Sequence, residues 1–122
     1  MPRRFRGLRT IAVHDLRVVV AETICARLLG LAGLASLPVD VVIALQRCRS
    51  IHTFGMRFPI GAAFVGRDGQ LLAVRASVPP GRVTSSLRAS LVLEWRAGAV
   101  ATSSVAELAR EVTCALDRER LE

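Results

Sequence analysis

The segment from Cys48 to Ile60 concentrates the side chains of this chain that can do chemistry. It holds one of the three cysteines, one of the two histidines, one of the two methionines and two of the four phenylalanines. Aliphatic side chains can pack but cannot donate, ligate or attack, so a site is expected where chemically capable residues collect. The candidate binding residues in this segment are Cys48, Ser50, His52, Thr53, Met56 and Arg57.

Three kinds of site are compatible with these residue types. His52 is either a tuned catalytic base or ligand, or a structural ring bonded to a backbone carbonyl. An imidazole beside Cys48 would stabilise a nucleophilic thiolate. Cys48, His52 and Met56 together offer ligands that suit Cu(I), although Gly55 and Pro59 disfavour the helix that would align them. Because no catalytic or ligand set is complete, neither a metal nor a cofactor is predicted.

Glu94 is a candidate outside this segment, because it interrupts an apolar strand. A carboxylate in such a place needs a partner. The partner is either an arginine, such as Arg27, Arg57 or Arg82, or His52 in a shared polar pocket. We expect His52 to be partly exposed and close to Glu94 or its arginine partner, and we include Arg27 among the candidate binding residues.

Length and composition predict one compact domain over residues 1–122. A chain of 122 residues, 52% of them hydrophobic, can bury a core of its own. The most apolar early stretch, residues 18–37, is interrupted by Glu22 and Arg27, which makes a membrane-spanning helix costly. The charges that follow the N-terminal arginines also interrupt the apolar run of an export signal. We therefore expect a cytoplasmic protein with no membrane partner.

The net charge of +7 has a compositional origin. All seventeen basic residues are arginine, and lysine, asparagine and tyrosine are absent. The codons of those three residues are AT-rich, so a GC-rich genome explains the excess of arginine. Residues 1–9 contain four of the arginines and are expected to form a flexible basic arm. Because no aromatic residues interleave with the other arginines, the expected partner is a small molecule or a protein and not nucleic acid.

The three cysteines predict neither a disulfide framework nor a zinc ribbon. Cys25, Cys48 and Cys114 are odd in number and far apart, and no Cys-x-x-Cys pair is present. Reduced thiols in a reducing compartment are therefore expected. Cys25 and Cys114 lie among aliphatic residues, where a thiol usually behaves as a small buried hydrophobe.

Hydrophobic patterning predicts a chain built mainly of strands. The strands are expected over residues 17–21, 39–45, 60–65, 71–78 and 91–95. Asp68 and Gly69 stand between two apolar runs and indicate a hairpin, since both residues tolerate positive φ. In the last strand, Leu91, Leu93 and Trp95 share one face.

Two helices complete the expected fold. Thr23 caps a short helix that Pro38 ends, and a terminal helix follows Ser104 with an apolar stripe. Residues 117–122 are charged and are expected to fray. Strands and helices do not alternate regularly, so the fold class is mainly β with helices. The expected architecture is a β-sandwich or half-open barrel, with one short helix after the first strand and a C-terminal helix.

Several ordered motifs stand between residues 18 and 98. They are RLLGL at 27–31, CRSIHTFGMRFPI at 48–60, PGR at 80–82 and VLE at 92–94. Together they resemble the domain of unknown function 192 family of small bacterial and archaeal proteins. The resemblance implies a compact, largely β fold and no established activity.

The chain departs from the pattern of that family at two places. The pattern that this chain resembles has an aspartate after the Pro-Ile of the central motif, where this chain has Gly61. Any role that depends on that carboxylate is therefore in doubt here. Family members also close with a glycine-bearing turn and a last strand, where the residues after Ser104 predict a helix.

The leading hypothesis is a non-catalytic binding or accessory module. Its site would combine the loop from Cys48 to Phe58 with the strand that carries Glu94. The competing hypothesis is a small thiol enzyme or hydrolase that uses Cys48 and His52. The sequence leaves the ligand and the oligomeric state open.

Overall fold

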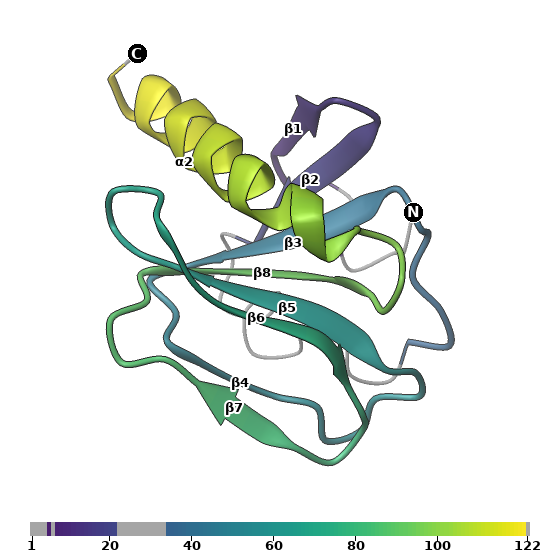
Figure 1. Ribbon diagram of the computed structural model, residues 1–122. Helices are drawn as coiled ribbons and strands as arrows, with labels where there is room; N and C mark the ends of the chain where they lie inside the picture. The colour runs from purple at the N-terminus through teal and green to yellow at the C-terminus, as the bar shows by residue number, and fades with distance from the viewer. Residues whose placement is uncertain (1–4, 6, 22–33, 122) are drawn as a thin grey trace.

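Figure 1 shows the computed structural model, which describes residue 5 and residues 7–21 and 34–121. Six strands form the main sheet in the order β1-β2-β3-β8-β5-β6, and β4 and β7 form a separate pair. The strands are β1 (Thr10–Val13), β2 (Leu16–Val20), β3 (Val41–Gln46), β4 (Ser50–His52), β5 (Ile60–Val65), β6 (Leu71–Val78), β7 (Val83–Ser85) and β8 (Leu91–Arg96). A 3₁₀ turn, η2 (Thr102–Ser104), leads into the helix α2 (Val105–Leu121). The expected class, mainly β in a sandwich or half-open barrel, is confirmed.

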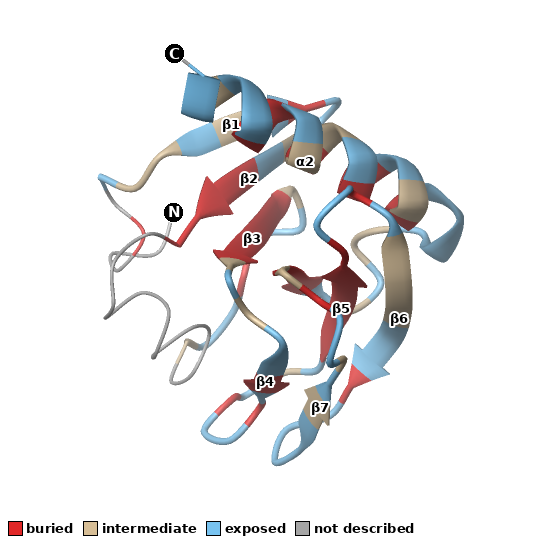
Figure 2. Ribbon diagram, turned by 90° about the vertical axis from the view of Figure 1, so that its left-hand side faces the viewer, coloured by how far each residue is buried: buried red, intermediate tan, exposed pale blue. Residues whose placement is uncertain are grey.

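The main sheet is open and is covered on both faces. Strands β2 and β3 run parallel, and the other neighbouring strands run antiparallel. Strand β8 lies between β3 and β5, and its first five residues are all buried. Helix α2 covers one face, and the β4–β7 pair lies on the other side (Figures 1 and 2). We call these the helix face and the ribbon face.

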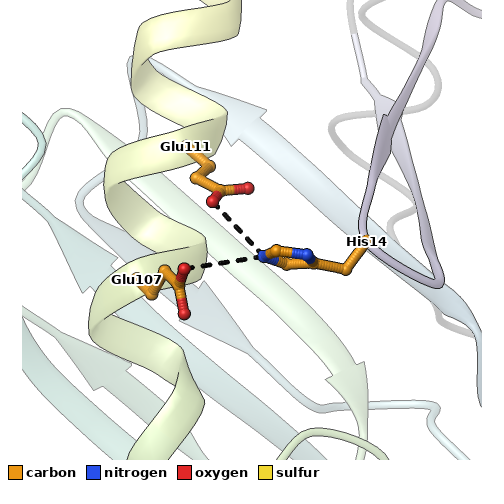
Figure 3. A group of neighbouring side chains, drawn as sticks. All are labelled: His14, Glu107 and Glu111. Atoms are coloured by element: carbon orange, nitrogen blue, oxygen red, sulfur yellow. Dashed lines mark ion pairs between the residues drawn. The ribbon is translucent and has the colours of Figure 1, made fainter.

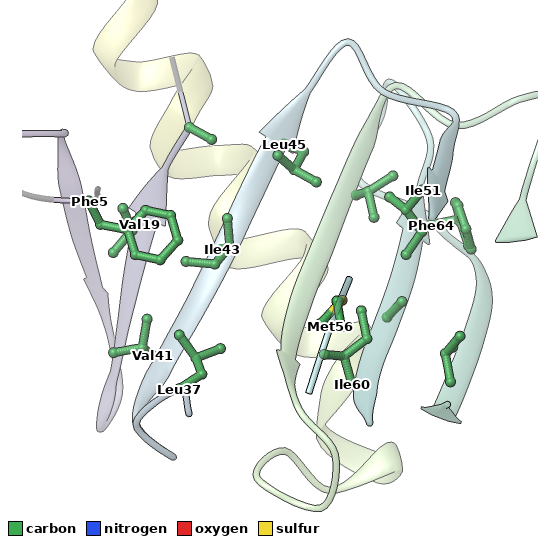
Figure 4. Packing of buried hydrophobic residues seen from close by; sticks show 14 of the residues in the cluster. Phe5, Val19, Leu37, Val41, Ile43, Leu45, Ile51, Met56, Ile60 and Phe64 are labelled. Carbon is green, nitrogen blue, oxygen red and sulfur yellow. The ribbon is translucent and has the colours of Figure 1, made fainter. Parts of the chain in front are cut away.

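Alternate residues along each strand feed two separate cores. On the helix face, the apolar stripe of α2 packs in one cluster with alternate residues of β8: Val105, Leu108, Ala109, Val112 and Leu116 with Leu91, Leu93 and Trp95. On the ribbon face, the main sheet contributes Ile43, Ile60 and Phe64, which are packed with Ile51 and Met56 (Figure 4). The expected faces of β8 and of α2 are therefore confirmed.

The β5–β6 hairpin forms as the sequence predicts. Its two strands have the expected bounds, and the turn between them holds Gly69 at a φ of 88°. The Asp68 carboxylate accepts a hydrogen bond from the Gln70 N–H at 3.0 Å, which closes the turn locally. Strand β6 ends at Val78, immediately before the two prolines, as expected.

Several expected boundaries need correction. Strands β1, β4 and β7 were not expected. Most of the expected short helix lies in residues 22–33, outside the described part of the chain, and residues 34–37, which precede Pro38, are not helical. Helix α2 continues to Leu121, so residues 117–121 are helical and do not fray. Asp117 accepts a hydrogen bond from Arg120 at 2.8 Å one turn later, which supports this end. Among the described residues, no helix combines the length and apolar character that crossing a membrane requires.

The N-terminal segment is attached to the domain at its described positions. The Phe5 side chain is 2% exposed and lies in the ribbon-face core near Val19 (Figure 4). Leu8 packs against the same cluster, and Arg9 forms an ion pair with Glu119 of α2. A segment with a buried aromatic ring is not a free arm, so the expectation of a flexible arm is corrected at these positions.

Candidate functional site

Strands β4 and β7 form a short ribbon that carries most of the expected site. Ser50 pairs with Ser85, Ile51 with Thr84 and His52 with Val83, so the two strands run antiparallel. Side chains alternate along β4: that of Ile51 is buried in the core, whereas Ser50 and His52 are exposed. We define the β4–β7 ribbon as these strands with their flanking turns, residues 47–59 and 79–90.

Thr53 fastens the ribbon to itself and is not available to a ligand. Its side chain is fully buried; the hydroxyl donates to the Pro79 carbonyl at 2.7 Å and accepts from the Arg82 N–H at 2.8 Å. The Thr53 backbone N–H donates to the Arg82 carbonyl at 2.8 Å, and its carbonyl accepts from the Gly81 N–H at 3.0 Å. These four bonds hold the end of β4 against the turn before β7, so Thr53 is a structural residue.

His52 and Phe54 form an exposed aromatic stack on either side of Thr53. Their ring centroids are 5.5 Å apart and the rings are inclined by 27°. Phe54 is 53% exposed and Val83, the cross-strand partner of His52, is 62% exposed. Arg57, two residues beyond Gly55, is exposed as well. The structure thus presents His52 on a surface, as the sequence predicts, but in an apolar patch.

Cys48 and His52 are engaged separately, which argues against a dyad. The Cys48 thiol donates to the Ser50 carbonyl at 3.2 Å, while the His52 ring is stacked on Phe54. Met56 is buried in the ribbon-face core and therefore does not join them in a soft-metal site. Cys114 is exposed on α2, so the expectation of a buried thiol there is wrong.

Glu94 lies inside the molecule on the ribbon face of β8. Its neighbours in register are Ile43 on β3 and Ala62 on β5, and both belong to the apolar core. The Glu94 side chain is 3% exposed, and burial raises its pKa from 4.5 to about 7. The cause is loss of hydration of the carboxylate, which favours the neutral acid.

Among the described residues, none of the side chains that the sequence suggests as partners for the Glu94 carboxylate contacts it by a hydrogen bond or ion pair. Arg57, Arg82 and His52 are exposed on the ribbon, and no residue in the described part of the chain makes a hydrogen bond or ion pair with Glu94. Arg27 lies outside the described residues. The sequence-based expectation of a shared His52–Glu94 pocket is therefore not supported.

Gly61 explains how this chain differs from the family pattern. It pairs across the sheet with Trp95, and a Cβ atom at Gly61 would lie 2.1 Å from Trp95 Nε1. Trp95 is 1% exposed and fills the space beside the glycine. The Trp95 indole fills the space that an aspartate side chain at position 61 would need. A site in this chain therefore cannot include a carboxylate at position 61.

A cavity of about 610 Å³ lies between the C-terminal half of α2 and the strand ends. No described candidate residue lines it. It contains four arginines and two carboxylates, of which Arg9 pairs with Glu119 and Arg120 with Asp117. Of the two acidic groups in this cavity, Glu119 thus links α2 to the segment before β1, and Asp117 pairs within the last turn of α2.

One cluster of chemically capable residues was missed by sequence reasoning. His14, in the turn between β1 and β2, directs Nε2 toward Glu107 and Glu111 on α2 (Figure 3). The distances from Nε2 to the carboxylate oxygens are 3.6 Å for Glu107 and 3.3 Å for Glu111. The spacing of the two glutamates on a helix was visible in the sequence, but nothing local to His14 links it to them.

An open sheet with a helix on one face and a ribbon on the other defines a small β-rich domain, and the comparisons place it in a family. The model of the domain of unknown function 192 family (DUF192), described as "Uncharacterized ACR", matches residues 8–110. The chain belongs to this family. Among curated proteins, none matches the chain.

Two solved structures share the fold. One is a protein from Sinorhizobium meliloti 1021 with a provisional description as a transcription regulator; it is 23% identical, with 76% of this chain and 81% of that chain covered and a TM-score of 0.63. The other is a protein of unknown function from Novosphingobium aromaticivorans DSM 12444, 19% identical, with 73% and 71% covered and a TM-score of 0.60. At these identities the likeness concerns the fold alone.

Proposed function

We propose that this chain is a non-catalytic binding module that recognises an acidic, partly apolar segment of another protein at the β4–β7 ribbon. The observation that carries the proposal is the exposed stack of His52 on Phe54, with Val83 beside it in register. Large apolar side chains that stand together in water are typical of interaction surfaces. Aromatic residues are also enriched where partners bind.

The backbone that presents this patch is fixed before any partner arrives. The buried hydroxyl of Thr53, between the two stacked residues, bonds to both the Pro79 carbonyl and the Arg82 N–H. Ile51 anchors the same strand in the core. A pre-organised surface loses little conformational entropy on binding, which favours recognition by rigid docking.

The charge of the ribbon selects the kind of partner. Its two segments contain no aspartate or glutamate but five exposed arginines: Arg47, Arg49, Arg57, Arg82 and Arg88. Charge complementarity therefore favours an acidic partner. Non-specific binding to a nucleic-acid strand instead uses a series of aromatic platforms along a groove, whereas this surface has a single stack, that of His52 on Phe54.

The open edges of the ribbon suit an extended peptide. Strands β4 and β7 are hydrogen bonded as a two-stranded sheet, so each keeps one edge without a partner strand among the described residues. An extended segment can add to such an edge through its main chain, and alternate side chains then face the surface of the domain. A glutamate-rich segment with interspersed apolar residues would satisfy both the edge and the arginines.

The thiol groups are consistent with this function and with a cytoplasmic location. Cys48 and Cys114 are not joined in disulfide bonds, as is usual for a reducing compartment. The Cys48 thiol is bonded to the Ser50 carbonyl, and the His52 ring is stacked on Phe54. These two contacts do not join the thiol to the imidazole, so they do not support the thiol-enzyme alternative.

Binding can be tested with defined peptides and backbone amide NMR spectra. The probe is an octapeptide of alternating glutamate and valine, and its controls carry lysine in place of glutamate or serine in place of valine. We expect micromolar binding by the first peptide, chemical-shift changes confined to the ribbon, and weaker binding as salt is raised. Both control peptides should fail to bind.

Matched variants separate the ribbon from non-specific effects. Phe54→Ser and Val83→Ser should each weaken binding about tenfold. Val39→Ser should leave it unchanged, because Val39 is 58% exposed but lies outside the ribbon. The proposal is overturned if the acidic peptide shifts no ribbon resonance, or if a single-stranded oligonucleotide binds the same residues more tightly. It is also overturned if Cys48 is alkylated far faster than the exposed Cys114 and the protein turns over a substrate in a reaction that needs Cys48.

A further inference from the structure

We propose that His14, Glu107 and Glu111 form a binding site for a divalent transition-metal ion of the zinc type. In the described part of the chain, they are the one group of three histidine, cysteine, aspartate or glutamate side chains whose ligand atoms lie within 4.8 Å of one another (Figure 3). The site is independent of the ribbon and of its proposed partner. It joins the β1–β2 turn to α2.

The two distances from His14 to the glutamates match the coordination shell of zinc, and the two carboxylate oxygens lie within 4.8 Å of each other. Metal–ligand distances of about 2.0 to 2.2 Å place neighbouring ligands of a tetrahedral ion about 3.3 to 3.6 Å apart. The His14 Nε2 lies 3.3 Å from the Glu111 oxygen and 3.6 Å from the Glu107 oxygen. In Figure 3 the imidazole points between the two carboxylates, so one ion can contact all three groups.

The elements that carry the ligands are fixed by packing and not by the ligands themselves. Glu107 and Glu111 lie four residues apart, on the same side of α2, and the helix is anchored by Val105, Leu108 and Val112 in the core. His14 follows Val13, which is buried in that same cluster. The three backbone positions are therefore set before a metal binds, which is the arrangement that metal sites require.

The donor set and its exposure indicate which ion fits. One imidazole nitrogen and two carboxylate oxygens suit zinc and its neighbours, whereas calcium and magnesium prefer oxygen ligands alone. The side chains of His14, Glu107 and Glu111 are 63%, 57% and 39% exposed, so water can reach the outer side of the ion. A bound cation would also remove the repulsion between two carboxylates that are one helical turn apart.

The test uses tag-free protein that has been stripped with a chelator and then titrated with Zn²⁺ by calorimetry and with Co²⁺ by visible absorption. We expect one ion per chain with micromolar affinity, a higher thermal midpoint, and a cobalt spectrum without thiolate charge transfer. His14→Ala should weaken binding by more than about 100-fold, and Glu111→Gln should weaken it less. His52→Ala is the matched control, because His52 is the other exposed histidine, and it should bind as the parent does.

The outcome separates a metal site from a simple ion pair. If His14 only pairs with the helix, His14→Ala lowers the thermal midpoint in chelator but leaves zinc binding unchanged, and the proposal fails. It also fails if binding requires millimolar metal, or if the cobalt spectrum shows cysteine ligands. Measuring every variant in chelator first establishes that it is folded, so loss of binding cannot be mistaken for loss of structure.

Discussion

The two faces of the main sheet are built in opposite ways. On the helix face, the apolar stripe of α2 closes over Leu93 and Trp95, and the polar residues of the helix stay at the surface. On the ribbon face, Glu94 is buried without a described partner, while Phe54 and Val83 stand in water. Departures from ordinary packing rules are often associated with function, and on this sheet they lie on the ribbon face.

Charge follows the same division. The exposed side of α2 carries four acidic residues between Glu107 and Glu119, whereas the ribbon carries arginine and no acidic residue. The acidic groups of the helix contact the N-terminal part of the chain through Arg9 and His14. Acidic charges on the helix thus bridge elements of the fold, and the ribbon presents a surface of one sign.

The largest expected effect tests the packing of the helix face. Gly61→Asp should destabilise the fold by about 4 kcal/mol or more, because its side chain would meet Trp95 and a carboxylate would be buried. Urea unfolding measures the loss. In a Trp95→Leu background the same substitution should cost less, since the space beside Gly61 is then partly vacated; equal costs in both backgrounds would show that Trp95 is not the obstacle.

The second prediction compares two phenylalanines on the ribbon side. Phe5→Ala should cost about 3 to 4 kcal/mol, because the ring is 2% exposed in the core. Phe54→Ala removes the same group from a position that is 53% exposed and should change stability by less than about 0.5 kcal/mol. Urea unfolding of both variants provides the comparison. Equal effects would mean that Phe5 is not packed as described, or that Phe54 supports the fold.

What the sequence predicts well is what local chemistry decides. Asp68 and Gly69 specify a turn by themselves, and the apolar spacing after Ser104 specifies both α2 and its buried side. Strands β4 and β7 have three residues each, too few for a diagnostic pattern, so only their pairing across the fold reveals them.

The parts of the site that could not be predicted depend on contacts between distant residues. The apolar run around Glu94 indicates that it is buried, but no local pattern says which side chains face it. His14 meets α2 only because the β1–β2 turn lies over the helix, and the two segments are far apart in the sequence. The likeness of the central motif to a family singled out the segment that contains β4, but it did not distinguish Thr53, which is buried and structural, from His52, which is exposed.

The last prediction concerns Glu94 and the pH dependence of stability. Its pKa is about 7 in the folded protein against 4.5 ordinarily, so the folded state holds the proton more tightly than the unfolded state. The contribution of Glu94 to stability is therefore fully present below pH 4.5, decreases as the pH rises toward 7, and is constant above that.

Glu94→Gln should remove this decrease. Relative to the parent, the variant should gain roughly 3 kcal/mol on going from acidic to mildly alkaline solution, as the parent carboxyl loses its proton. Urea unfolding of the parent and the variant across the pH range measures the difference. A constant difference between parent and Glu94→Gln would mean that the carboxylate is stabilised in the folded protein, and the ribbon face would then hold a partner for it after all.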